Sequence, residues 1–305
     1  MNLNEAIQNA KPGDTINVPA GTHAASLVID KPLTLKGEGP GRSIIDARRA
    51  GPTILVAAET GRVSLIGLSL LNGSSPQGGC IAYVRGDELW VEDCLLEGGV
   101  CRSYGGGGAF LVARKASFTR VRIQKCVGAQ GGGLLVDEEC EVELLACAIT
   151  GNAAEHGGAL RVKEGANVKL VHCTLAENQG LGKTPLGPEI LASGTMTRSP
   201  ELTIINSIIA PKVPSAPAIT TLGNFAAKVT VDHSLFPEGS TVTGPGVRFG
   251  APEFFPSGVH RQKLGPSSPA AGTADPKQTP QGLLDLLGKK LSRGADADMG
   301  AYAAV

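Results

Sequence analysis

Three similar segments decide the fold of this chain: LWVEDCLLEGG at 89–99, VELLACAITGN at 142–152 and VKLVHCTLAEN at 168–178. Each has a cysteine at the same place, and the pattern returns about every 26 residues along most of the sequence. The column that contains the cysteines steps by 26, 27, 26, 26, 34 and 27 residues, and its members are Leu68, Cys94, Val121, Cys147, Cys173, Ser207 and Ser234. A repeat of this length is typical of a solenoid, in which each coil stacks on the next.

Two further ladders indicate that each coil consists of short strands. Two positions after the first column the residues are Leu70, Leu96, Ile123, Ile149, Leu175, Ile209 and Phe236, so an apolar pair recurs at strand spacing. Gly-Gly pairs at 78–79, 107–108, 132–133 and 157–158 each precede another apolar run. The 42 glycines and 20 prolines suit the turns of such a fold, and helical periodicity is absent between the runs. We therefore predict an all-β, single-stranded parallel β-helix of about 26 residues per coil.

The two ends of the sequence differ from the repeat. Leu3, Ala6, Ile7 and Ala10 have the spacing of a short amphipathic helix, which we expect to cap the first coil. Leucines at helical spacing in 281–291 predict a second cap or an irregular tail. The expected organisation is an N-terminal cap over 1–22, the β-helix over 23–250 and a C-terminal cap or tail over 251–305, all within one structural domain.

Charge and cysteine content limit the classes of partner. The 28 basic and 28 acidic side chains balance, which gives no reason to expect a nucleic-acid partner, and no apolar run is long enough to span a membrane. Local basic groups at Arg42, Arg48 and Arg49, and at 114–122, are interpreted as solvated surface. Seven cysteines, an odd number without CxxC spacing, favour free thiols stacked in the core over a metal or redox site. Without an evident signal peptide we expect a cytoplasmic protein, or an exported one if Met1 replaces a secretion signal.

Both ends of the chain carry a resemblance to a known family. EAIQNAKPGDTINVPAGTH at 5–23 and LVIDKPLTLKGEGPGRSIID at 27–46 are similar to the opening of right-handed parallel β-helix proteins of the pectin-lyase-like superfamily. KLGPSSPAAGT at 263–273 and DADMGAY at 296–302 resemble the ending of bacterial β-helix proteins. The resemblance implies a right-handed coil. It leaves function open, because this superfamily contains lyases, hydrolases, epimerases, adhesins and binding proteins.

The resemblance also implies where a catalytic site would lie, namely on the outer face of one parallel sheet. Strand alternation predicts outward columns of Leu111, Leu135, Arg161 and Leu191, and of Ala113, Asp137, Lys163 and Ser193. A lyase related to this superfamily would use carboxylates to hold Ca²⁺ and a basic side chain to remove a proton. The candidate catalytic residues are Asp137, Glu155, His156, Arg161 and Lys163.

The candidate catalytic set is incomplete. One outward carboxylate does not make a calcium cage, although Glu138, Glu139 and Glu155 lie nearby in sequence. The hydrolase pattern of the superfamily is echoed only by EHGG at 155–158 and Arg161-Val162-Lys163, without paired upstream aspartates. His156 precedes a Gly-Gly turn, where a surface-loop histidine is the more ordinary interpretation. The VCRSYGGGG loop at 100–108 lacks the Lys-Ser/Thr ending of a phosphate-binding loop.

We therefore favour a non-catalytic β-helix that presents a rigid flank to an extended polysaccharide or to a protein partner, with self-association along the same flank as a further expectation. The candidate ligand-binding residues are Ala82, Arg102, Tyr104, Leu111, Leu135 and Arg161. No cofactor and no metal site are predicted for this function. The alternative is a polysaccharide lyase or related uronate-active enzyme, for which Ca²⁺ is the expected cofactor; a hydrolase is less favoured.

Overall fold

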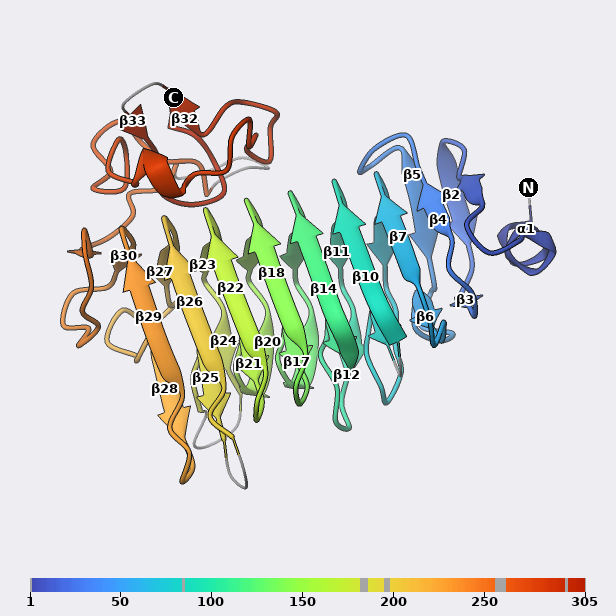
Figure 1. The fold of residues 1–305 in the computed structure, drawn as a ribbon, viewed down its shortest axis with the longest axis horizontal. Coiled ribbons are helices and arrows are strands. Elements are labelled where there is room, and N and C mark those ends of the chain that lie inside the picture. The colour runs from blue at the N-terminus through green and yellow to red at the C-terminus, as the bar shows by residue number, and fades with distance from the viewer. Residues whose placement is uncertain are drawn as a thin grey trace.

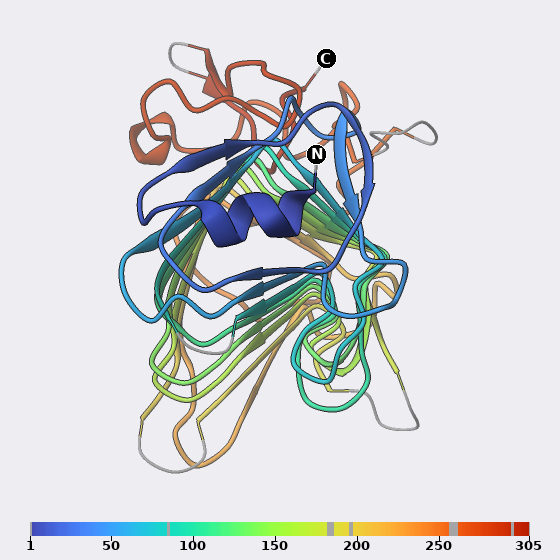
Figure 2. The ribbon, with the colours of Figure 1, turned by 90° about the vertical axis from the view of Figure 1, so that its right-hand side faces the viewer.

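The computed structural model describes residues 2–83, 86–181, 186–194, 198–255, 262–293 and 296–304. In this part of the chain, strands form a parallel β-solenoid whose coils follow one another along the long axis of the molecule (Figure 1). Viewed from the N-terminal end, the chain turns clockwise as it recedes, which is a right-handed coil (Figure 2). The predicted fold class is confirmed.

Three long parallel sheets make the walls of the solenoid. Sheet A consists of β1 Thr15–Asn17, β4 Thr34–Lys36, β7 Arg62–Ile66, β10 Gly86–Glu92, β14 Ala113–Thr119, β18 Glu141–Leu145, β22 Asn167–Val171, β26 Glu201–Ile205 and β29 Lys228–Asp232. Sheet B consists of β2 Gly21–Ala24, β5 Ser43–Asp46, β8 Ser69–Leu71, β11 Leu95–Glu97, β15 Arg122–Gln124, β19 Ala148–Thr150, β23 Thr174–Ala176, β27 Ile208–Ala210, β30 Leu235–Phe236 and β31 Arg248–Phe249. Sheet C consists of β3 Leu27–Ile29, β6 Ile54–Val56, β9 Ile81–Tyr83, β13 Ala109–Leu111, β17 Leu134–Val136, β21 Leu160–Val162, β25 Ile190–Ser193 and β28 Ile219–Leu222.

A fourth, smaller parallel sheet lies in the loops that lead from sheet B to sheet C. This sheet D consists of β12 Val100–Cys101, β16 Val127–Gln130, β20 Ala153–His156 and β24 Gln179–Gly180. In Figure 2 these loops form a smaller lobe at the lower right, beside the main coil. The sequence repeat did not predict this additional sheet.

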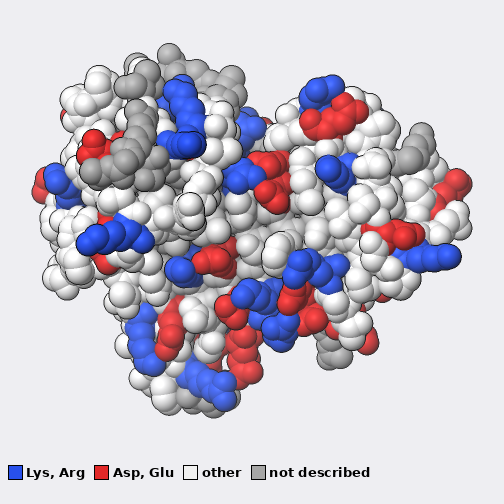
Figure 3. Space-filling view, turned by 45° about the horizontal axis from the view of Figure 1, so that its top comes forward, with Lys and Arg blue, Asp and Glu red and all other residues white. Residues whose placement is uncertain are grey.

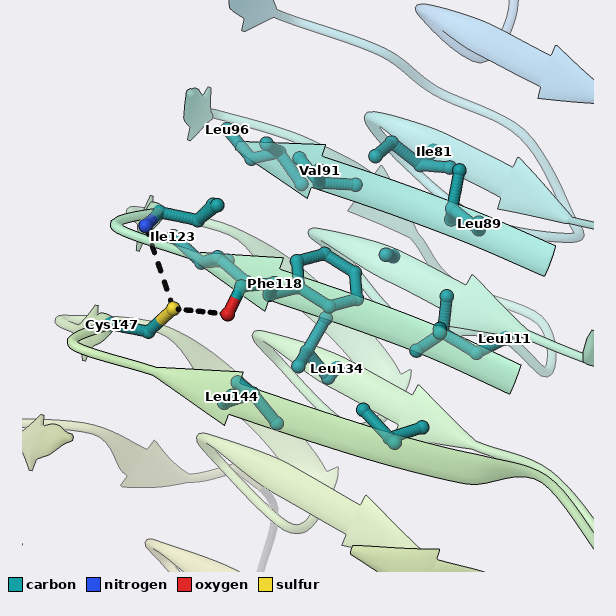
Figure 4. Packing of buried hydrophobic residues seen from close by; sticks show 14 of the residues in the cluster. Ile81, Leu89, Val91, Leu96, Leu111, Phe118, Ile123, Leu134, Leu144 and Cys147 are labelled. Atoms are coloured by element: carbon teal, nitrogen blue, oxygen red, sulfur yellow. Dashed lines mark hydrogen bonds between the residues drawn. The ribbon is translucent and has the colours of Figure 1, made fainter. Parts of the chain in front are cut away.

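The alignment of residues given by the 26-residue repeat is the same as the pairing of residues on adjacent strands in the structure. Leu96, Ile123 and Ile149 are partners on adjacent coils of sheet B, as the 26-residue repeat requires. Their side chains are fully buried, and Figure 4 shows Leu96 and Ile123 with Phe118 and Leu134 inside the coil. The core is therefore a stack of like residues, each in contact with its counterpart one coil away.

The cysteines are part of this core. All seven are free and buried, including Cys101, Cys126 and Cys140. The Cys147 thiol donates to the backbone oxygens of Phe118 and Leu145 at 3.3 and 3.4 Å, and burial raises the pKa of this thiol well above its usual range. The buried Cys147 thiol is therefore a structural group with low reactivity.

The N-terminal cap is a helix, as predicted. In α1, Leu3–Asn9, Leu3 and Ile7 are buried against the first coil, and the Asn2 side chain accepts from the first free backbone amides. At the other end of α1 the Lys31 ammonium donates to three backbone oxygens at 3.2–3.4 Å. The first solenoid strand begins at Thr15, within the range assigned to the cap.

The C-terminal segment does not form the helix that its leucine spacing suggested. Residues 281–291 fold into turns, and the Asp285 carboxylate accepts from the backbone amides of Leu287, Lys289 and Ala303. Side-chain bonds of this kind compete with helix formation, and Gly282 and Gly288 have left-handed φ values of 74° and 77°. The remaining elements are η1 Pro276–Gln278 and the antiparallel pair β32 Ser292–Arg293 and β33 Asp296–Ala297.

This C-terminal tail, residues 262–293 and 296–304, lies along the side of the coils rather than across their end (Figure 1). Its apolar residues pack on the outer face of sheet B, where Ala301 and Tyr302 cover Ala148. The sharp bend between sheets A and B holds it through His172, whose ring nitrogens bond Asp298 O at 2.9 Å and Thr279 Oγ1 at 2.8 Å. The His172 ring therefore fastens the tail to this bend.

Acid is expected to loosen the tail. Burial lowers the pKa of His172 from 6.5 to about 4, so the undocked state takes up the proton first. The contribution of His172 to docking is then complete above pH 6.5 and is lost as the pH falls towards 4. Hydrogen-exchange protection factors of residues 275–304, corrected for intrinsic rates, should fall between pH 6.5 and 4.5. A His172→Gln variant should show a much weaker pH dependence; an identical dependence would contradict the assignment.

Candidate functional site

The outer face of sheet C is largely covered. Its outward column contains Ala82, Phe110, Leu135, Arg161 and Leu191, and the apolar members are at most 7 % exposed. The loops that carry sheet D fold over this face. The apolar flank predicted as a ligand-binding surface is thus interior, and Ala82 and Leu135 are not available to a ligand.

Leu111 was assigned to this outward column, and that assignment is wrong. Leu111 pairs with Val136 in an inward column, is fully buried and belongs to the main core, whereas its neighbour Phe110 pairs with Leu135. The error is one residue of register, which moves a side chain to the opposite face of a strand. It arose because Phe110 rather than Ala109 was taken as the first inward residue after the glycine run.

Three of the five candidate catalytic residues come together at the uncovered margin of this face. The Lys163 ammonium hydrogen-bonds to the Asp137 carboxylate and to the Tyr104 hydroxyl, and it lies 5.1 Å from the centre of the Tyr104 ring. Tyr104 in turn packs edge-on against Phe110 at 5.9 Å. Burial alone would lower the pKa of Lys163, but the bonds to Asp137 and Tyr104 raise it above its usual range. Lys163 is thereby held as a cation, which does not suit a proton-abstracting base.

Arg161 is held by the protein. One of its guanidinium nitrogens donates to Ser193 Oγ at 2.6 Å and another to the backbone oxygens of Val162 and Leu191. Burial lowers the pKa of Arg161, an effect that Tyr104 and Asp137 oppose. The Nε atom is buried without a partner in the described part of the chain. Most of the donor capacity of Arg161 is therefore used internally.

Glu155 and His156 lie elsewhere, on β20 of sheet D. Glu155 is exposed and His156 is half-buried. Among the described residues, no hydrogen bond or ion pair joins either of them to Asp137, Arg161 or Lys163. Nor do any three His, Cys, Asp or Glu side chains lie together as a metal-binding group within the described ranges.

A different site lies at the edge of sheet D. A hollow of about 500 Å³, here called the serine–arginine hollow, is lined by Arg49, Ser74, Ser75, Pro76, Val100, Arg102 and Ser103. The loops after three successive strands of sheet B supply these residues. The solenoid therefore places them side by side although they are far apart in sequence.

The serine–arginine hollow has positive charge without a matching carboxylate. Arg102 is exposed and has no hydrogen-bond or ion-pair partner among the described residues, and no acidic residue contributes to the lining. The Arg49 Nη1 atom donates to the backbone oxygens of Gly98 and Gly73 at 2.5 and 3.2 Å, which fixes the guanidinium at the rim. Arg102 was predicted from sequence as a ligand-binding residue and Arg49 as part of a basic group, whereas the serines carry no recognisable sequence signal.

Most other cations on the walls are neutralised. Arg114 pairs with Asp87 and Glu88, Lys115 with Glu141, and Arg120 with Glu92 and Asp93. In Figure 3 blue and red side chains accordingly lie next to one another over much of the visible surface. The basic group predicted at 114–122 is therefore solvated, ion-paired surface, with Arg122 as an exception.

No protein-family model matches the chain, and no curated protein sequence matches it. No helix in the described ranges has the length and apolar character needed to cross a membrane.

Proposed function

We propose that this protein is a non-catalytic β-solenoid that binds an extended acidic polysaccharide at the serine–arginine hollow. The observation that carries the proposal is the presence of Arg49 and Arg102 beside serine hydroxyls, with no carboxylate in the lining. Guanidinium groups form paired hydrogen bonds with carboxylates, which uronic acid units supply, and serine hydroxyls bond sugar hydroxyls. The solenoid is rigid, so little ordering entropy opposes binding.

Tyr104 stands between the lining residue Ser103 and sheet C, where its ring packs against Phe110. The residue follows Ser103, and 43 % of its surface is exposed. An exposed aromatic ring is a suitable platform for the apolar face of a sugar, and the bond from Lys163 to its hydroxyl fixes the orientation. Of the candidate ligand-binding residues, Arg102 and Tyr104 thus remain in the proposal, whereas Arg161 is largely occupied by Ser193 and backbone oxygens.

The proposal includes kinship with the pectin-lyase-like superfamily. It is supported by the N-terminal pattern at 5–46 together with the parallel coil. The lyase alternative rests on Asp137, Arg161 and Lys163. Against it stand the protonated state of Lys163 and the internal bonds of Arg161. Accumulation of unsaturated uronate, followed by its ultraviolet absorbance, with loss of this activity in Arg161→Ala, would favour the lyase and contradict the non-catalytic proposal.

Removal of Arg102 should weaken binding of polygalacturonate at least tenfold. A hydrogen bond to a charged group contributes about 1.5–3 kcal/mol, and about 1.4 kcal/mol corresponds to a factor of ten in affinity. Titration calorimetry on wild type and Arg102→Ala measures the change. Arg114→Ala removes another exposed arginine, one paired with Asp87 and Glu88, and should leave the affinity unchanged. Equal binding of a neutral galactan, or full affinity in Arg102→Ala, would overturn the proposal.

A further inference from the structure

The C-terminal tail covers only part of the outer face of sheet B. In the outward column, Ala148, Thr174 and Ile208 are buried beneath it, and the Ala301 amide donates to Thr174 Oγ1 at 2.9 Å. The two preceding members of that column, Leu95 and Arg122, are only half-buried. The tail therefore ends as a wall beside an uncovered stretch of sheet.

A second hollow lies along this wall. Its volume is about 380 Å³, and it extends from Leu286 of the tail to the loop at 37–40, across Arg120, Arg122 and Asp93. In Figure 3 a recess separates the tail at the upper left from the N-terminal loops at the upper right. We call this recess the tail hollow.

Among the described residues, Arg122 is the cation lining the tail hollow that forms no ion pair, although its charge also acts on the nearby Glu97 carboxylate. Glu38 is bound by Arg42 at 2.8 Å and by the Ala20 amide at 3.1 Å. Both oxygens of Asp93 are bound by Arg120, at 2.7 and 2.8 Å. Arg122, by contrast, has no hydrogen-bond or ion-pair partner within the described ranges. A half-buried guanidinium in a recess is a ready partner for a carboxylate.

The two hollows lie at opposite ends of one strand. Cys94 lines the tail hollow, β11 follows, and Val100 lines the serine–arginine hollow. Six residues of extended chain span at most roughly 20 Å, and the bend at Gly98 shortens this path. Between the hollows, Glu97 is neutralised by Lys125 at 2.7 Å and also accepts from Gln124. The carboxylate of β11 itself is therefore neutralised, so an acidic chain of several sugar units can follow β11 from one hollow to the other.

The geometry points to the tail hollow as a second carboxylate-binding subsite for the same polysaccharide, with Arg122 as its ligand-binding residue. This inference rests on the proposed function. The bound chain then lies across sheet B, parallel to β11, between the tail and the loop at 37–40. Binding depends on chain length, because only a chain that reaches both hollows contacts Arg102 and Arg122 together.

Two galacturonate oligomers test the inference by calorimetry: a disaccharide, which fills one hollow, and an octasaccharide, which reaches both. Arg122→Ala should lower the octasaccharide affinity about tenfold and leave the disaccharide affinity at the Arg102 site unchanged. Arg102→Ala should lower both affinities. Arg122→Lys should give an intermediate octasaccharide affinity, because an ammonium keeps the charge but not the paired geometry.

Lys169→Ala provides the matched control, since Lys169 is an exposed cation paired with Glu143 on sheet A. Its oligomer affinities should equal those of wild type, and the melting temperatures of all variants should agree. Full octasaccharide affinity in Arg122→Ala, with a loss in Arg102→Ala, would overturn the second subsite while the proposed function stands. Absence of binding by wild type to either oligomer would instead overturn the proposed function itself.

Discussion

Gly132→Ala is expected to destabilise the solenoid by more than about 4 kcal/mol, a large share of the stability of an ordinary domain. A Cβ at this position would lie 2.2 Å from Gly158 O and 2.7 Å from the backbone nitrogen and oxygen of Ala153. These are backbone atoms of the next coil, so they have no rotamer by which to move aside. The expected result is a large drop in the urea midpoint, or a failure to fold.

The control for this prediction is Gly151→Ala, in the loop that follows sheet B in the next coil. Gly151 has a left-handed φ of 64°, and no atom lies within 4 Å of its added Cβ. Alanine at this position should lower the free energy of unfolding by only about 1 kcal/mol, from backbone strain alone. Gly132 is not left-handed, so its effect would come from close approach. Equal losses in the two variants would contradict the steric explanation of the Gly-Gly ladder.

The contribution of one buried carboxyl group to the free energy of unfolding is expected to fall by a few kcal/mol as the pH rises from 4.5 to 8. Asn152 and Asn178 form a ladder of side-chain amides on adjacent coils, and Glu189 ends it. Its two oxygens accept from the Asn178 backbone amide at 3.1 Å and from Asn178 Nδ2 at 2.7 Å. Burial nevertheless raises the pKa of Glu189 from 4.5 to about 8.

The direction of this pH dependence follows from the difference in the pKa of Glu189 between the folded and unfolded states. Below pH 4.5 the carboxyl is neutral in both states, and the stability it contributes is complete. Above pH 4.5 the unfolded chain ionises while the folded chain keeps its proton, so stability falls until the pH reaches about 8. Urea denaturation at intervals from pH 6.5 to 8 isolates this effect, because the His172 contribution is constant there. Glu189→Gln cannot ionise and should lose this slope; a variant that keeps the wild-type slope would refute the assignment.

The fold could be predicted because the repeat is a direct record of the packing. Leu96, Ile123 and Ile149 are in register with one another on adjacent coils, so their spacing in sequence is the length of a coil. The buried cysteine stack followed from the same column. The amphipathic pattern of α1 was also sufficient to predict the N-terminal cap, since Leu3 and Ile7 pack against the first coil.

The candidate site could be predicted less well from the sequence, because its geometry depends on loops rather than on the repeat. Tyr104 and Lys163 meet although 59 residues separate them, and only the fold of the sheet D loop brings them together. The one-residue error at Leu111 arose in the glycine run before β13, where glycines carry no inward or outward pattern. Arg49 and Ser103 likewise belong to different coils, and their proximity depends on where each loop turns.

The tail also has a kinetic consequence. Successive coils form contacts about 26 residues apart, whereas Asp298 reaches His172 across 126 residues and Asn206 bonds Asp275 across 69. Contacts between distant parts of a chain form only after a large loop has closed, and the entropy cost of that closure precedes the stabilisation that the contacts give. Moreover, the surface that the tail needs exists only after the coils containing His172 and Asn206 have formed. Docking of the tail should therefore be the last step of folding and the first to reverse.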